Sequence, residues 1–138
     1  MKRYLIICCV LCVALSVRSQ YNANVIIEQV LRTDTTSIGQ KIVYPLVSNA
    51  EVTMSKITFP PGSSTGWHKH DIPVFAYVLE GELTVELEDG KVMRFKQGTS
   101  FAEVHDTWHN GKNNTTDNLV LVAVYMGEKG KFLSKSKQ

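Results

Sequence analysis

The sequence predicts an all-β domain, and three features of its pattern lead to that prediction. Most apolar segments alternate with period two, as a half-buried strand does, and none keeps a helical period for long. Gly and Pro interrupt these segments at short intervals. Short strands punctuated in this way are typical of a sandwich or barrel. The length of 138 residues suits one such domain and leaves no room for a second.

The first segment of the chain, residues 1–19, is expected to be a signal peptide rather than part of that domain. Met1-Lys2-Arg3 is basic, Tyr4 to Leu15 is an apolar run of twelve residues, and Ser16 to Ser19 offers small residues for cleavage. A transmembrane helix needs about 20 apolar residues, so an uncleaved anchor is the weaker alternative. We therefore expect an exported protein, periplasmic or secreted, with no stable membrane anchor and with residues 20–138 as its single domain.

Removing residues 1–19 changes the chemistry open to the mature chain. All three cysteines, Cys8, Cys9 and Cys12, leave with the signal, which excludes thiol and disulfide chemistry. Lys and Arg fall from 15 to 12 against 13 acids, a formal charge of −1. With no basic stripe in the sequence, no nucleic-acid partner is expected.

The expected strands can be placed in order along the mature chain. Val25 to Leu31 fits either a short helix or a first strand. Glu51 to Phe59 is rich in β-forming residues and ends at Pro60-Pro61-Gly62, which breaks regular structure. Further strands are expected at Phe75 to Leu79, Ser100 to Val104, Trp108-His109 and Leu119 to Met126, and the polar tail Lys129 to Gln138 is expected to fray.

The clearest local signal is a hairpin. Glu82 to Glu88 alternates strictly and places Leu83, Val85 and Leu87 on one face. Asp89-Gly90 then suits the positive φ angles of a tight turn, and Lys91 to Lys96 returns as the partner strand.

Two histidines one residue apart provide the first candidate site. Residues i and i+2 of a strand point the same way, so His68 and His70 project side by side. Two ligands rarely hold a metal well, so a third should come from another strand. The remaining histidines are His105 and His109. Each of the four, taken singly, fits a packing or surface role as well as a ligand role.

The spacing of these histidines resembles that of the cupin superfamily, with a motif region at 62–113. The residues that match its two motifs are Gly62, His68, His70 and Gly81, and then Gly98, His109 and Asn113. The resemblance implies a double-stranded β-helix, the cupin or jelly-roll-like barrel, in a small single-domain cupin. It also implies that His68, His70 and His109 are metal ligands and that Asn113 takes the place of the motif's last residue.

Three positions depart from the motifs. Val74 stands where the first motif has a Glu ligand, and Val104 and Asp106 stand where the second has Pro and Gly. The resemblance then implies three neutral imidazoles with open positions for substrate, which favours one divalent transition metal per chain over Mg or Ca. Fe, Zn, Cu, Ni and Mn are not distinguished. Because each imidazole must be deprotonated to bind, we expect metal loss as the pH falls through the histidine range.

The walls of the pocket follow from strand parity. Counting from Val74, Ala76 and Val78 should face the cavity, and Asn113 is expected beside them. The alternative for Asn113 is to close a loop through side-chain hydrogen bonds. His105 lies in a turn and is expected to be exposed.

Glu103 is the candidate catalytic residue. It lies between Ala102 and Val104 in an apolar strand, where a carboxylate is costly unless it is paired or exposed. It could be a general base, a substitute ligand or a substrate anchor, or it could simply face solvent.

Two functions remain open from the sequence. One is an enzyme whose metal supports oxidation, isomerisation or lyase chemistry on a small organic substrate. The alternative is a non-catalytic cupin that binds or senses a small ligand, with or without metal, since a fold does not fix a function. Small barrels with apolar outer strands often pair, so a homodimer is expected.

Overall fold

The computed structural model describes residues 24–137, so the expected signal peptide at 1–19 lies outside the described residues. Within that range the chain is all-β, with no helix, as the sequence predicts. No part of the described chain forms a helix with the length and apolarity needed to cross a membrane. The strands are β1 (Ala50–Phe59), β2 (His68–Lys69), β3 (Val74–Glu80), β4 (Glu82–Leu87), β5 (Val92–Lys96), β6 (Ser100–Ala102), β7 (His109–Lys112), β8 (Leu119–Glu128) and β9 (Lys135–Ser136).

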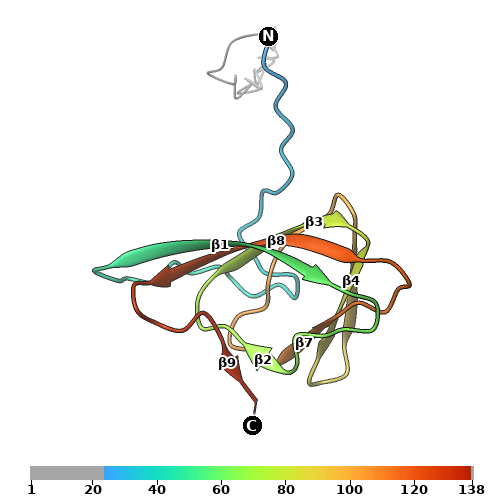
Figure 1. Ribbon diagram of the computed structural model, residues 1–138. Coiled ribbons are helices and arrows are strands. Elements are labelled where there is room, and N and C mark those ends of the chain that lie inside the picture. The colour runs from blue at the N-terminus through green and yellow to red at the C-terminus, as the bar shows by residue number, and fades with distance from the viewer. Residues whose placement is uncertain (1–23, 138) are drawn as a thin grey trace, which may run out of the picture.

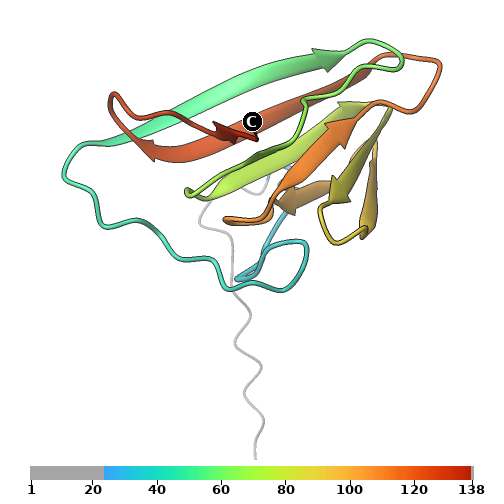
Figure 2. The same cartoon turned by 90° about the horizontal axis from the view of Figure 1, so that it is seen from below.

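The strands form two antiparallel sheets that lie as two layers (Figures 1 and 2). One sheet has the order β1-β8-β3-β6 and the other the order β5-β4-β7-β2-β9. Apart from the β4–β5 hairpin, neighbours in each sheet are not consecutive in sequence, so the chain passes repeatedly between the layers. This is the architecture of a double-stranded β-helix, and it confirms the expected fold class.

The hairpin forms where the sequence predicts it. Gly90 has a φ of 87°, and the Leu87 amide donates to the Lys91 carbonyl at 2.8 Å, which closes the turn between β4 and β5. Leu83, Val85 and Leu87 are all buried against the opposite sheet. The alternation therefore reports the buried face of β4 correctly.

The core lies between the two sheets. β3 and β8 supply its other half through Val74, Ala76, Val78, Leu121 and Ala123, all of them buried. These side chains face inward together because Val78 is opposite Leu121 and Ala76 is opposite Ala123 in the antiparallel register.

Two segments differ from what the sequence suggests. Residues 25–31 form neither the helix nor the strand considered for them, and instead run as an extended arm away from the barrel (Figure 1). The tail is not frayed: β9 pairs with β2, with Ser136 opposite His68 and Lys135 opposite Lys69. The Lys137 amide also donates to the Trp67 carbonyl at 2.9 Å, so the tail is fixed beside the histidine strand.

Candidate metal centre

Three of the four histidines converge inside the barrel. His68 on β2 is directly opposite His109 on β7, and their ring centroids are 4.3 Å apart. His70 follows β2, and its ring lies 4.9 Å from that of His68 and 5.3 Å from that of His109. Ligand atoms of these three residues and of Glu103 all lie within 4.8 Å of one another. The structure thus brings together His68, His70 and His109 as the two motifs imply.

Each imidazole is oriented by a backbone carbonyl. The Nδ1 atoms lie 3.0 Å from the Gly66 oxygen for His68, 2.7 Å from the Leu133 oxygen for His70 and 2.8 Å from the Thr107 oxygen for His109. A carbonyl only accepts, so each Nδ1 carries the proton and donates it. Each neutral ring then presents the lone pair of Nε2, which is how metal-binding histidines are usually prepared.

Glu103 places a carboxylate beside the three imidazoles. It follows β6, with its amide donating to the Val74 carbonyl at 2.8 Å, and its Oε2 lies 3.1 Å from His70 Nε2 and 3.4 Å from His109 Nε2. A carboxylate that follows β6 therefore joins the three histidines in one cluster. Of the roles considered for Glu103, facing solvent is the one that this position does not fit.

The arrangement of the buried polar atoms at this centre fits a bound cation. Within residues 24–137, Glu103 Oε2 and His109 Nε2 are buried and have no hydrogen-bond donor. Lone pairs of two imidazole nitrogens face a carboxylate oxygen at close range, an arrangement that is repulsive unless a positive charge lies among them. Nitrogen ligands with one carboxylate fit a divalent transition metal. The donor set present therefore fits the metal that the sequence implies.

The pKa values of the metal-free site follow from burial and from the carboxylate. Burial lowers the pKa of His68. Burial also opposes protonation of His70, but the adjacent Glu103 carboxylate outweighs it and raises the pKa of His70 above 6.5. Burial works in the other direction on Glu103, yet the rings of His109 and His70, which can donate to the carboxylate through Nε2 when they are protonated, hold the pKa of that carboxyl well below its usual range. Without metal, the carboxylate therefore favours a proton on His70.

A cavity of about 40 Å³ lies against these four residues. Its other walls are mainly apolar, with side chains of Ile57, Phe59, Leu83, Val85, Leu121 and Ala123. A cavity must offer about 10–15 Å³ by this measure to hold one water molecule, so this cavity is small. The site accepts only a few non-hydrogen atoms unless side chains move.

Tyr125 and Thr65 also line this cavity, although no sequence pattern predicted them there. Within residues 24–137 the Tyr125 hydroxyl has no hydrogen-bond partner, and its ring packs 5.7 Å from that of His70. Burial, and then the Glu103 charge, raise the pKa of Tyr125, so the phenol stays protonated and can donate. One signal was available: Tyr125 is the only polar side chain in the apolar segment Leu119 to Met126.

The residues expected to form the pocket lie elsewhere. Ala76 and Val78 face the interior but belong to the packed core rather than to the cavity wall. Val74 lines a second, separate pocket. The inward parity is as expected, but Leu121, Ala123 and Tyr125 of the adjacent strand stand nearer the histidines.

Asn113 is not brought to the cavity; it closes a loop. Its side-chain nitrogen donates to the Phe59 carbonyl at 2.9 Å and to the Asp117 carbonyl at 2.7 Å, and its oxygen accepts from the amide and hydroxyl of Thr115. The side chain is fully buried, at 0% exposure. The hydrogen-bonding capacity of the amide is thus used to hold the connection between β7 and β8.

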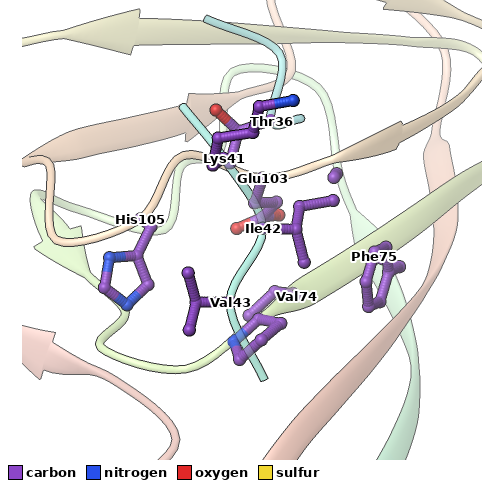
Figure 3. Close-up of a pocket in the computed structure, with 10 residues that line it drawn as sticks. Thr36, Lys41, Ile42, Val43, Val74, Phe75, Glu103 and His105 are labelled. Carbon is purple, nitrogen blue, oxygen red and sulfur yellow. The ribbon is translucent and has the colours of Figure 1, made fainter. Parts of the chain in front are cut away.

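The second pocket lies beside Glu103, as Figure 3 shows, and has a volume of about 60 Å³. Ile42, Val43, Val74 and Phe75 make it largely apolar. His105 lies at this pocket rather than at the three-histidine centre, and is exposed as expected. Glu103 lines both cavities, so one carboxylate stands between them.

The two residues that depart from the second motif, Val104 and Asp106, are accommodated within the fold. Asp106, where the motif has Gly, adopts a φ of 45° and so takes the left-handed conformation that Gly usually supplies. Its carboxylate accepts from Lys69 Nζ at 2.6 Å across the strand ends. Val104 is buried in the core.

Comparisons with known proteins agree with this architecture. The family model for the cupin domain matches residues 55–125, about half of the chain and the region that contains all four residues of the centre. A cupin domain from Bordetella pertussis superposes with a TM-score of 0.50 at 26% identity, covering 59% of this chain and 86% of that one. A Klebsiella pneumoniae protein with a double-stranded β-helix domain gives a TM-score of 0.53 at 18% identity, covering 69% and 91%.

An oxalate decarboxylase from Lactobacillus farciminis, solved as a formate complex, gives a TM-score of 0.54 at 16% identity. The match covers 62% of this chain but only 26% of the decarboxylase, and shows a shared fold. No curated protein matches the chain. The family match, the two-sheet topology and the motif residues at the centre lead to one assignment: this chain belongs to the cupin family.

Proposed function

We propose that the protein is an exported cupin that binds one divalent transition metal per chain and uses it on a small organic substrate. The observation that carries the proposal is the convergence of three oriented Nε2 atoms and a buried carboxylate with no donor among them. Export rests on the basic and apolar pattern of residues 1–19 alone.

His68, His70 and His109 would hold the metal through Nε2, and Glu103 would complete the set through Oε2. When bound, such a metal supplies a Lewis acid and, for a redox-active ion, a route to oxidation. The carbonyls of Gly66, Leu133 and Thr107 keep the three rings in the binding tautomer. The charge of Glu103 reduces the net charge of the loaded site by one, which replaces the effect of the missing motif carboxylate.

The remaining groups of the cavity define the substrate class. The walls are mostly apolar, and the Tyr125 hydroxyl offers one hydrogen bond to an oxygen of the bound molecule. The volume of about 40 Å³ limits the substrate to a few atoms near the histidines. We infer a small acid or carbonyl compound of two to four carbons, oriented by Tyr125 and with Glu103 able to move a proton.

The second candidate is a binding or sensing module with the same metal and no turnover. The observation in its favour is the polarity of the cavity: beyond the four residues of the metal centre, its polar lining side chains are Tyr125 and Thr65. Thr65 is already engaged, since its hydroxyl accepts from the Gly111 amide at 3.0 Å.

The experiment that tests the proposal uses mature protein, residues 20–138, loaded in turn with Fe, Mn, Zn, Cu and Ni. Each form is incubated with acids and carbonyl compounds of two to four carbons, and products are followed by NMR together with oxygen uptake. We expect one metal form to turn over a substrate and a chelator-treated sample to lose that activity. Ligand binding without any product in all metal forms would favour the binding module.

A further inference from the structure

The turn at residues 105–107 is connected to two of the metal-binding histidines through its backbone. The Thr107 carbonyl accepts from His109 Nδ1 at 2.8 Å, and the Asp106 amide donates to the His70 carbonyl at 2.7 Å. The first contact selects the tautomer of His109, and the second fixes the backbone from which His70 projects. A displacement of this turn would therefore disturb two ligands at once.

A single side chain from a distant part of the sequence holds this turn. Gln40 accepts from the His105 amide at 2.9 Å through Oε1 and donates to the His105 carbonyl at 2.9 Å through Nε2. Nε2 also donates to the Thr107 hydroxyl at 3.2 Å. The side-chain amide of Gln40 thus pairs with both backbone groups of His105, as a neighbouring strand would. Because one atom must accept and the other must donate, a single orientation of the amide satisfies these contacts.

The rest of the hydrogen-bonding capacity of Gln40 is used within its own segment. Residues 34–42, which we call the strap, fold back on themselves through the pairing of Thr35 with Lys41. Inside the strap, the hydroxyl of the buried Thr36 donates to Gln40 Oε1 at 3.1 Å and accepts from the Gln40 backbone amide at 3.2 Å. Both hydrogens of the Gln40 side chain and its carbonyl oxygen then have partners, so the side chain is fixed between the strap and the turn.

The strap also lies beside Glu103. The Ser37 amide donates to the Ala102 carbonyl at 2.9 Å, immediately before that carboxylate in the chain. Ile42 of the strap stands with Glu103 in the wall of the second pocket, as Figure 3 shows. The strap is therefore hydrogen-bonded to the chain on both sides of Glu103, before it through Ser37 and after it through Gln40.

We propose that Gln40 is a positioning residue of the metal centre. By joining the strap to the turn 105–107, it keeps the Thr107 carbonyl on His109 Nδ1 and holds Glu103 within reach of the three rings. The inference rests on the proposed metal site, but the orientation of His109 can also be measured without metal. A residue that only tied down a surface loop would change stability and leave the tautomer of a buried imidazole unaffected.

Gln40→Glu tests this role because the two side chains have the same shape. The substitution removes both donated hydrogen bonds and sets a carboxylate oxygen against the His105 carbonyl. Gln40→Met, which removes the hydrogen bonds without adding a charge, is the second variant. The matched control is Gln97→Glu, the same chemical change at an exposed position between β5 and β6. Circular dichroism and the thermal unfolding midpoint show whether each variant is folded.

The first measurement is the affinity of residues 20–138 for cobalt(II), obtained by competition with a chelator, together with the visible absorption that reports the ligand geometry of the cobalt form. Loss of a group that orients a metal ligand typically costs 10- to 100-fold in affinity. We expect about that loss, with altered cobalt absorption, in both Gln40 variants and neither change in Gln97→Glu.

The second measurement is the tautomer of His109 in the metal-free protein, from ¹⁵N spectra of the imidazole rings recorded above the histidine pH range. The wild type should carry the proton on Nδ1, and both Gln40 variants should show a mixture of the two tautomers.

Lower cobalt affinity together with a mixed His109 tautomer, in folded Gln40 variants alone, supports the proposal. Wild-type affinity or an unchanged tautomer in those variants would overturn it, as would equal losses in Gln97→Glu. If the wild-type chain bound no cobalt, the proposed metal site would fail, and the tautomer of His109 alone would decide the role of Gln40.

Discussion

Replacing Glu103 by Gln separates its role as a metal ligand from its role in packing, because the two side chains have the same shape. Oε2 lies 3.1 Å from His70 Nε2, and a unit positive charge held at about that distance from the carboxylate would be worth about 5 kcal/mol at an effective dielectric constant near 20. Against this stands the cost of keeping a carboxylate buried, several kcal/mol, which the amide avoids. The net loss on substitution is then about 1.5–3 kcal/mol of metal binding, or roughly 10- to 100-fold in Kd.

The assay is competition between the protein and a chelator of known affinity, at pH 8, for one chosen metal. Glu86→Gln is the matched control, since Glu86 is a half-buried carboxylate paired with Lys112 on the outside of the other sheet. We expect Glu86→Gln to bind metal like the wild type. Equal metal affinity in Glu103→Gln and wild type would refute the reasoning that Glu103 completes the site.

Three further outcomes follow from the same structure. Because the Glu103 carboxylate raises the pKa of His70, a proton on that ring competes with the metal, and metal affinity should fall as the pH is lowered through the histidine range, measured by the same competition; a flat profile would contradict the proton–metal competition. Ending the chain after Gly130 removes β9 and the Leu133 carbonyl, and should weaken metal binding roughly 10- to 100-fold while circular dichroism keeps its β signature; unchanged affinity would show that the tail does not position His70. Asn113→Ala should lower the free energy of unfolding by about 2–4 kcal/mol, measured in urea, and leave metal content unchanged, because the side chain holds a loop and not the metal; loss of metal in folded variant protein would be inconsistent with that role.

Much of the fold could be read from the sequence because local patterns specify it. The alternation of Leu83, Val85 and Leu87 identifies a buried face, and Asp89-Gly90 identifies a turn, without reference to the rest of the chain. β9 was missed as a strand because it is only two residues long and its pairing depends on the distant β2. The polar segment Lys129 to Gln138 contains no sequence pattern that predicts pairing with β2.

In the candidate site, too, local sequence patterns predict some residues, while tertiary packing alone positions the others. His68 and His70 are adjacent by strand parity, and the spacing of motif residues points to His109. Strand parity also predicts correctly that Ala76 and Val78 point inward. It does not predict which inward-pointing residue lies nearest the histidines, because the position of each residue relative to the histidines depends on the register between β3 and β8. Tyr125 occupies that place, and Glu103 reaches the centre only because β6 ends beside β3.

The central claim is that three imidazoles and one carboxylate bind a metal. Its most direct test is the metal content, by mass spectrometry, of purified residues 20–138 beside a His68→Ala, His109→Ala double variant, both dialysed against the same trace-metal buffer. We expect close to one transition metal per wild-type chain and almost none in the folded double variant. Equal metal in the two proteins would contradict it.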